Sequence, residues 1–269
     1  MSKTWDAIII GGGAAGLFCA GVAGQLGKKV LVLDHAPVLG EKIRISGGGR
    51  CNFTNLHSSP ANFLSLNPHF VKSALARYPA AEFIKLIQSY RIAYHEKHQG
   101  QLFCDDSAKQ VVEMLMSECA RGNVTIRHPV AIESIAQECN QWLIKTNAGI
   151  EKSKSVVMAT GGLPVPAIGA TAYSLDIAKQ FGLNVIEPRP ALVPLSFTAE
   201  TFSGLNELAG LSVPIGIGSG SNGSRYGACH FNEDVLITHK GLSGPAILQA
   251  SSYWAEGEPI QIDWLANVG

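Results

Sequence analysis

The sequence predicts an α/β fold that begins with a parallel sheet and continues into a second, mostly β-stranded domain. An apolar run at residues 7–11 ends in glycines, a helical pattern rich in Ala and Leu follows at 14–26, and a second apolar run occupies 30–33. A strand–helix–strand unit of about 30 residues is the size that a right-handed crossover between parallel strands needs. Apolar runs without alternation are typical of strands buried on both faces.

Further patterns place the remaining elements. Apolar residues recur at helical spacing in residues 80–90 and 108–119, and residues 92–103 suit a hairpin that turns at Gln99 and Gly100. Strands are predicted at 124–130, 132–136, 142–146 and 155–159, and after a proline-rich change of character at 191–197, 212–217, 235–238 and 260–264. We therefore expect one domain at residues 1–188 and an inserted, β-rich domain at 189–269.

The composition restricts the function classes. Of the 269 residues 46% are hydrophobic, so a sizeable core can form, and the 21 basic and 21 acidic residues cancel. A net charge of zero argues against a broad surface for nucleic acid and leaves room for a local basic patch. No apolar run is long enough to span a bilayer, and the start lacks a signal-peptide pattern. The six cysteines form no CxxC pair and no cysteine–histidine cluster, so we expect free thiols, no metal site and a cytoplasmic protein.

The segment GGGAAG at residues 11–16 fits the G-x-G-x-x-G pattern between a strand and a helix. Its first glycine permits the tight turn, the second lets the backbone approach a pyrophosphate, and the third lets helix and strand pack closely. The helix N-terminus adds amides and a partial positive charge. Asp34 lies where a carboxylate would bind a ribose diol; the alternative is an ordinary turn with a surface aspartate. The predicted dinucleotide-binding residues here are Gly11, Gly13, Ala14, Ala15, Gly16, Asp34 and the adjacent His35.

A second glycine-rich segment, SGGGRCN, follows at residues 46–52. Three consecutive glycines are costly to order and add no packing, so a ligand that approaches the backbone explains them better than a flexible loop does. Basic side chains around the segment suit phosphate. Cys51 has no neighbouring histidine base, which favours a packed residue over a nucleophile. The candidate cofactor-binding residues here are Lys42, Arg44, Ser46, Gly47, Gly48, Gly49, Arg50, Cys51 and Asn52.

Two later motifs carry weaker signals. Ala159, Thr160, Gly161 and Gly162 end an apolar strand and fit a third backbone wall around the same dinucleotide, although a plain strand-to-loop turn is an equal alternative. His239, in the segment THKGLSGP, is either a proton donor near a substrate or part of a turn that leads into a helix from Pro245. No residue can be named as a catalytic acid or base.

Together the two glycine loops, Asp34 and the ATGG turn indicate FAD rather than any dinucleotide. The segments at residues 11–16 and 40–55, the ATGG turn, PALVPL at 190–195 and THKGLSGP at 238–245 resemble, in the same order, the BaiN/RdsA (YhiN-like) family of FAD-dependent oxidoreductases. The resemblance covers essentially the whole chain, and SGGGRCN is its most specific part.

The resemblance implies a Rossmann-like FAD-binding domain of the two-dinucleotide-binding-domain flavoprotein type. It also implies NAD(P)H as electron donor, Val130 as a backbone contact to the adenine, and substrates that range from small molecules to a uridine in ribosomal RNA. Family members continue through a helical segment to a C-terminal glycine-rich motif, whereas this chain ends at Gly269. We therefore expect an incomplete second domain and a C-terminally truncated protein.

Three functions follow from these observations. The first is an FAD-dependent oxidoreductase, with NAD(P)H as donor, acting on an unknown small-molecule substrate or electron acceptor, with nucleic acid suggested by family analogy alone and no membrane partner. The second is a truncated, catalytically inactive FAD-binding fragment. The third is a nicotinamide-only dehydrogenase, on which view the second glycine loop has no explanation. The sequence does not indicate the oligomeric state.

Overall fold

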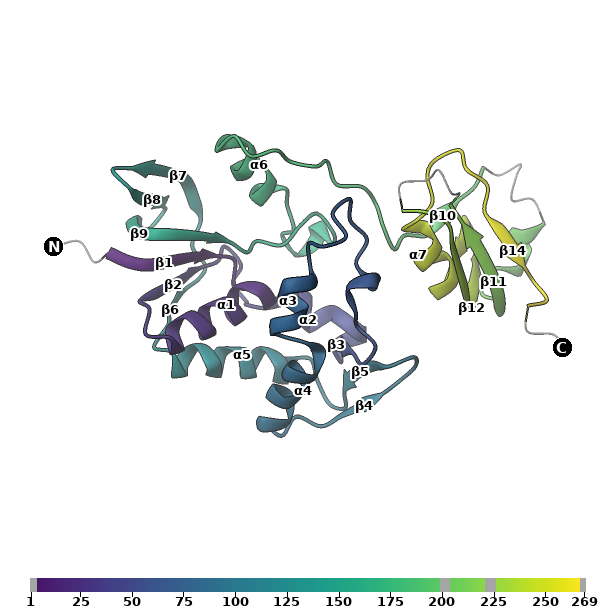
Figure 1. The fold of residues 1–269 in the computed structure, drawn as a ribbon, viewed down its shortest axis with the longest axis horizontal. Coiled ribbons are helices and arrows are strands. Elements are labelled where there is room, and N and C mark those ends of the chain that lie inside the picture. The colour runs from purple at the N-terminus through teal and green to yellow at the C-terminus, as the bar shows by residue number, and fades with distance from the viewer. Residues whose placement is uncertain (1–3, 199–203, 221–225, 267–269) are drawn as a thin grey trace. The chain divides into compact units, whose positions relative to one another are not determined.

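The computed structural model describes residues 4–198, 204–220 and 226–266, which divide into two compact units (Figure 1). The first unit comprises the described residues within Met1–Ser58 and Ala74–Val185, and the second comprises those within Ser59–Ser73 and Ile186–Gly269. The second unit therefore includes a segment, 59–73, that the sequence places in the first domain.

A six-stranded sheet in the order β6-β2-β1-β9-β8-β7 forms the centre of the first unit. The strands β6, β2, β1 and β9 are parallel, and β8 and β7 continue the sheet in antiparallel pairing. The parallel α/β fold predicted from the first crossover is confirmed. The strands are β1 (Thr4–Ile10), β2 (Val30–Leu33), β6 (Thr125–Arg127), β7 (Ile132–Glu138), β8 (Gln141–Thr146) and β9 (Gly149–Met158).

Both faces of β2 and of the carboxyl half of β1 are buried, as their unbroken apolar sequences predict. Successive side chains of a strand point to opposite faces. Val30 and Val32 of β2 accordingly pack into the apolar cluster that contains Leu17 of helix α1. Leu31 and Leu33 pack into a second cluster, which also holds apolar residues of β7, β8 and helix α6.

Helices cover the sheet and form part of the connections between its strands (Figure 1). The helices α1 and α5 lie side by side on one face of the sheet and share its larger apolar cluster. The α-helices are α1 (Ala14–Gln25), α2 (Glu41–Ile45), α3 (Lys72–Arg77), α4 (Ala80–Ser89), α5 (Lys109–Arg121), α6 (Tyr173–Gln180) and α7 (Pro245–Ser251). Short 3₁₀ helices are η1 (Ser46–Gly49), η2 (Pro60–Asn62), η3 (Pro166–Ile168) and η4 (Leu205–Leu208).

A small antiparallel sheet in the order β3-β5-β4 lies beside α4 in the first unit. It consists of β3 (Asn52–Asn55), β4 (Tyr94–Glu96) and β5 (Gln101–Cys104). The predicted hairpin is confirmed: β4 and β5 pair, and the residues at its tip, Gln99 and Gly100, have φ angles of 46° and 78°. The second glycine-rich segment, at residues 46–52, leads directly into β3.

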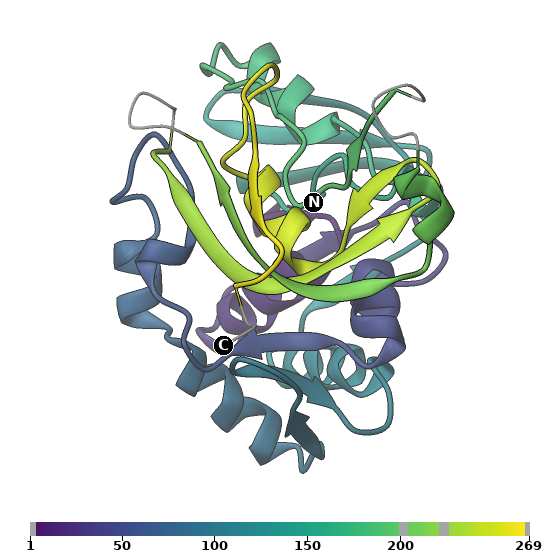
Figure 2. The same cartoon turned by 90° about the vertical axis from the view of Figure 1, so that its right-hand side faces the viewer.

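The second unit contains an antiparallel sheet in the order β10-β13-β12-β11-β14, which curves around α7 (Figure 2). Its strands are β10 (Leu195–Ser196), β11 (Ser212–Ser219), β12 (Cys229–Thr238), β13 (Gly241–Ser243) and β14 (Gln261–Asp263). The strand predicted at 191–197 is largely wrong, because Pro190 and Pro194 have no N–H for a ladder and Leu192 has a φ of 55°. The helix predicted from Pro245 is confirmed.

Candidate functional site

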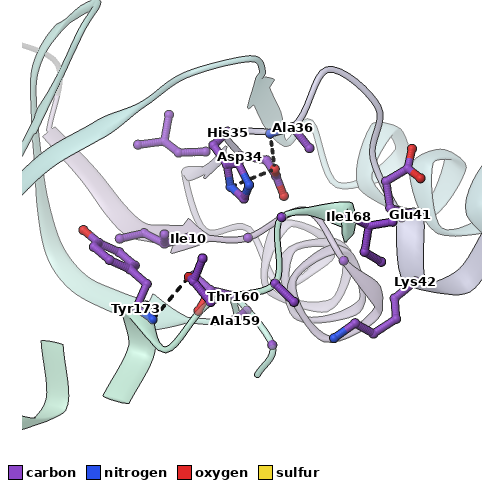
Figure 3. Close-up of a pocket in the computed structure, with 18 of the residues that line it drawn as sticks. Ile10, Asp34, His35, Ala36, Glu41, Lys42, Ala159, Thr160, Ile168 and Tyr173 are labelled. Atoms are coloured by element: carbon purple, nitrogen blue, oxygen red, sulfur yellow. Dashed lines mark hydrogen bonds and ion pairs between the residues drawn. The ribbon is translucent and has the colours of Figure 1, made fainter. Parts of the chain in front are cut away.

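The carboxyl ends of β1, β2 and β9 meet at one edge of the six-stranded sheet, because the three strands are parallel and adjacent. There they open onto a cavity of about 720 Å³ (Figure 3). This volume lies within the roughly 300–1,000 Å³ of small-molecule sites. The walls come from the strand ends, the start of α1, helix α2 and the loops around residues 130–132 and 168–173.

The first glycine loop lies at the start of α1 and is fixed by close backbone contacts. A Cβ on Gly11 would lie 2.3 Å from the carbonyl oxygen of Ala159, and a Cβ on Gly16 would lie 1.8 Å from that of Gly11. At Gly13, by contrast, no atom lies within 4 Å of the position of a Cβ. Gly13 lines the cavity and precedes the first turn of α1, where no side chain caps the helix. The free end of the helix therefore faces the cavity and offers amides and partial positive charge to an anion.

Asp34 connects the end of β2 to the first glycine loop. Its Oδ2 accepts the N–H of Gly12 at 2.5 Å, and its Oδ1 accepts the N–H of Ala36 at 2.7 Å. The side chain is 12% exposed and lines the cavity, with Nδ1 of His35 3.8 Å from Oδ1. A carboxylate has about four acceptor positions, so these two bonds leave capacity for a ligand hydroxyl. The ribose-binding role of Asp34 stays a prediction.

The turn after β9 carries an unsatisfied polar group. The Oγ1 atom of Thr160 is buried and makes no hydrogen bond within the described structure, although Thr160 lines the cavity. A buried hydroxyl without a partner costs about 1–3 kcal/mol. Lys42 of α2 brings a cation to the same turn: its Nζ lies 3.8 Å from the position that a Cβ on Gly161 would take. Figure 3 shows this side chain extending toward the turn.

The second glycine loop continues from the end of α2 and has a different geometry. Gly47, Gly48 and Gly49 have φ angles of 58°, 66° and 85°, a left-handed conformation that favours glycine. The carbonyl of Gly49 accepts the N–H of Ala108 at 2.7 Å, and the carbonyl of Arg50 accepts that of Cys104 at 2.9 Å. These two hydrogen bonds anchor the C-terminal end of the loop, while Gly47 and Gly48 are exposed.

The cavity brings together about half of the predicted site residues. Those that line it are Gly11, Gly13, Ala14, Ala15, Asp34, His35, Lys42, Val130, Ala159, Thr160 and Gly161. Those outside its lining are Gly16, Arg44, Ser46, Gly47, Gly48, Gly49, Arg50, Cys51, Asn52 and Gly162. Two of the latter support the site: Gly16 packs against Gly11, and Nε of Arg44 donates to the carbonyl of Leu39 at 3.0 Å. The ligand roles of the others stay predictions.

Sequence reasoning missed the wall formed by residues 168–173. Gly169 lies against His35, since a Cβ on it would be 2.7 Å from Nε2 of that ring. Tyr173 begins α6 and lines the cavity, and burial raises the pKa of its phenol. No motif marks this segment; its proximity to the ATGG turn was the one available signal.

The thiol of Cys51 is buried beside the second glycine loop. Burial raises its pKa, against the opposing effect of a hydrogen bond with Ser46, and a protonated thiol is a poor nucleophile. Among the described residues no group of three His, Cys, Asp or Glu side chains could hold a metal ion. No described helix is both long and apolar enough to cross a membrane.

The parallel sheet, the crossover at GGGAAG and the cavity at the strand ends define a Rossmann-like nucleotide-binding fold, joined to an antiparallel-sheet unit. The chain belongs to the family described as "HI0933-like protein Rossmann domain", whose model matches residues 5–249. The family resemblance drawn from the motifs is thereby confirmed.

Curated relatives extend this assignment. The chain is 49% identical over 266 residues to a ribosomal RNA dihydrouridine synthase of Escherichia coli, with 99% of this chain and 65% of the relative covered. It is 47% identical over 271 residues to the protein of the same name in Haemophilus influenzae, at 99% and 66% coverage. A 3-dehydro-bile acid delta(4,6)-reductase of Clostridium scindens is 26% identical, at 93% and 60% coverage. The chain thus spans about two thirds of the length of these relatives.

Solved structures give weaker similarity. L-proline dehydrogenase from P. horikoshii matches with a TM-score of 0.47 and 12% identity, covering 90% of this chain and 69% of that one. THI4 of Thermovibrio ammonificans matches with a TM-score of 0.45 and 14% identity, covering 70% and 67%.

Proposed function

We propose that this chain binds FAD in the cavity at the strand ends and provides the cofactor-binding part of an FAD-dependent oxidoreductase. The observation that carries the proposal is the open space at Gly13, where the uncapped start of α1 faces the cavity. A diphosphate placed there would receive backbone amides and the positive end of the helix. The unsatisfied hydroxyl of Thr160 and the ammonium of Lys42 would supply further hydrogen bonds at the neighbouring turn.

The residues of the chain bind and orient the cofactor, which when bound supplies the electron-transfer chemistry. Asp34 would accept hydrogen bonds from the adenosine ribose, and Val130, which lines the cavity beyond β6, would meet the adenine. Arg50 and the exposed glycines of the second loop would contact the part of the cofactor that extends past α2. Asp34 also holds the first loop in shape through Gly12, so binding and loop geometry depend on one carboxylate.

For the substrate we propose a uridine in ribosomal RNA. Two relatives at 49% and 47% identity carry the name ribosomal RNA dihydrouridine synthase, whereas the bile-acid reductase is 26% identical. Conversion of uridine into dihydrouridine adds two hydrogens and needs a reductant, for which we propose NAD(P)H. Ribosomal RNA as substrate would place the protein in the cytoplasm.

Identification of the bound nucleotide tests the cofactor proposal. The chain is purified, its visible absorbance is recorded, and the denatured protein is analysed by mass spectrometry for released nucleotides. We expect a yellow protein that releases FAD, or one that becomes yellow on incubation with FAD. A sample that stays colourless after that incubation, or that releases a nicotinamide nucleotide alone, would overturn it.

Gly13→Ala tests the position of the cofactor. The added methyl group would stand in open cavity space at the start of α1, and Gly13 has an ordinary φ of −86°, so the fold tolerates alanine. We expect FAD affinity to fall about fivefold to 150-fold, because overpacking at a contact costs about 1–3 kcal/mol. Fluorescence titration with FAD measures the change. Gly218→Ala, in β11 with 3.7 Å to its nearest atom, is the control and should bind like the parent protein. Equal affinity of Gly13→Ala would place the diphosphate elsewhere.

A further inference from the structure

The solvent side of the small sheet β3-β5-β4 carries polar, cationic and aromatic groups in a regular arrangement. Asn52, Phe103 and His95 form one row across the three strands, since Asn52 and His95 each pair with Phe103. Asn55 and Gln101 form the next row. We call these residues, together with Lys97, the polar face: Asn52, Asn55, His95, Lys97, Gln101 and Phe103.

The opposite side of the same sheet belongs to the core. Tyr94 and Cys104, which pair with each other, both pack into the larger apolar cluster of the first unit. The ring of Phe53 meets that of Tyr94 edge-on at 5.5 Å. Strand alternation therefore directs His95 and Phe103 to the other side of the sheet. There His95 is exposed, whereas the Phe103 ring is only 8% exposed and lies beneath its neighbours. Apart from Phe103, the side chains of the polar face are exposed or half-buried, so core packing does not require their polar character.

Aromatic and cationic groups are fixed on this face by contacts with Phe103. The ring of His95 stacks on Phe103 at 6.3 Å with an interplanar angle of 18°, and Nδ1 of His95 lies 2.7 Å from Asp105. The His95 side chain is 43% exposed, so its other ring face is accessible. Nζ of Lys97 lies 5.4 Å from the centre of the Phe103 ring. Lys97 is exposed and makes no ion pair among the described residues.

The polar face lies next to the second glycine loop. The side chain of Phe103 touches Gly47, since a Cβ there would lie 2.8 Å from Cε1 of the ring. Gly47 continues from α2, whose residues Glu41, Lys42 and Ile43 line the cavity. A ligand on the polar face is therefore one loop away from the cofactor site proposed above.

We infer that the polar face binds an unpaired pyrimidine nucleotide of RNA, an inference that rests on the proposed function. Single-stranded bases are recognised by stacking on aromatic or histidine rings and by hydrogen bonds to their edges. The His95 ring offers the stacking surface, and the Gln101 amide offers both a donor and an acceptor to the uracil edge. Lys97 would neutralise a phosphate.

The excess of basic residues lies in the unit that carries the polar face. Lys and Arg outnumber Asp and Glu in the sequence of the first unit, whereas the reverse holds for the second unit. The carboxylates beside the polar face are engaged: Asp105 contacts His95, and Glu96 accepts the N–H of Gly100 at 2.9 Å.

The test measures binding of a fluorescein-labelled oligouridylate to the full chain by anisotropy over a range of salt concentrations. We expect Lys97→Gln to weaken binding about three- to tenfold and to reduce the salt slope by about 0.7, the value for one phosphate contact on a single strand. Lys97→Arg should restore both. We expect Gln101→Ala to reduce the preference for oligouridylate over oligoadenylate about fivefold. The control Lys28→Gln, exposed in the loop after α1, should leave both quantities unchanged.

Three outcomes would overturn the inference: binding by Lys97→Gln equal to the parent, an equal loss in Lys28→Gln, or competition by polyglutamate as strong as that by oligouridylate, which would indicate a site for acidic protein segments. The FAD content of each variant is measured on the same preparations. If FAD is absent but binding still depends on Lys97, the proposed cofactor is wrong and the polar face stands. If FAD is present and binding does not depend on Lys97, this inference alone fails.

Discussion

The two glycine loops of the first unit use the same residue for different physical reasons. In the first loop, Gly11 and Gly16 are required because a Cβ would collide with backbone oxygens. These oxygens lie 2.3 Å from the Cβ position of Gly11 and 1.8 Å from that of Gly16. In the second loop, Gly48 has no atom within 4 Å of that position, and its left-handed φ of 66° is what favours glycine. Gly16 is therefore sensitive to volume, and Gly48 is sensitive to backbone conformation.

Gly16→Ala should produce the largest effect. The methyl group would collide with the backbone of Gly11, which cannot move without displacing β1 or α1. We expect the free energy of unfolding to fall by about 3 kcal/mol. Urea unfolding followed by far-UV circular dichroism measures it, with Gly162→Ala as control because its nearest atom is 3.9 Å away. An unchanged urea midpoint for Gly16→Ala would contradict the packing explanation of the first loop.

Two buried thiols, one against α1 and one beside the second loop, should make stability depend on alkaline pH. Cys119 donates to the carbonyl of Leu17 in α1, and the backbone of Cys104 holds Arg50 of the second loop. Burial raises the pKa of each thiol from 9.0 to about 11. The unfolded chain therefore loses these protons first as pH rises, so the stability is fully present below pH 9 and is lost between pH 9 and 11.

Each thiol should account for up to about 2.7 kcal/mol of that loss. Urea unfolding at pH 8 and at pH 10.5 measures it, and the variants Cys104→Ala and Cys119→Ala should each show a smaller difference between the two pH values. Cys139→Ala, which removes an exposed thiol, serves as control. If neither variant reduces the pH dependence, these thiols do not carry it.

Gly48→Ala should give the smallest effect. Because the space around Gly48 is open, the left-handed conformation is the one cost of alanine, and we expect the free energy of unfolding to fall by about 1 kcal/mol. Gly48→Asn should cost less, because asparagine tolerates this conformation. Urea unfolding ranks the three proteins. A loss as large as that of Gly16→Ala would show that Gly48 is packed after all, and the difference between Gly16 and Gly48 would disappear.

The first crossover could be predicted from the sequence because its signals agree. Unbroken apolar runs, a glycine turn and a helix that ends before Gly27 all indicate the same local structure. Helix α2 could not be predicted, because Glu41–Ile45 is too short to show a helical period. The strand at 191–197 failed because its apolar residues obey the pattern while its prolines prevent the ladder.

For the site, residue type was predictable and geometry was not. The glycine pattern identified the residues at the start of α1, since their chemistry depends on local sequence. The bond from the N–H of Gly12 to Asp34 and the contact of His35 with Gly169 depend on how segments distant in the sequence fold together. The wall at 168–173 carries no motif because ordinary side chains such as Ile168 and Tyr173 form it.

Strand β9 changes partners along its length. Its first residues pair with β8, Lys152 and Ser153 lie between β8 and β1, and its last residues pair with β1 before the chain reaches Thr160. One unbroken backbone therefore joins the cavity to the hairpin of β7 and β8. Local opening of that hairpin would loosen the cavity floor, and an occupant held at Thr160 would in turn slow amide exchange in strands that it never touches.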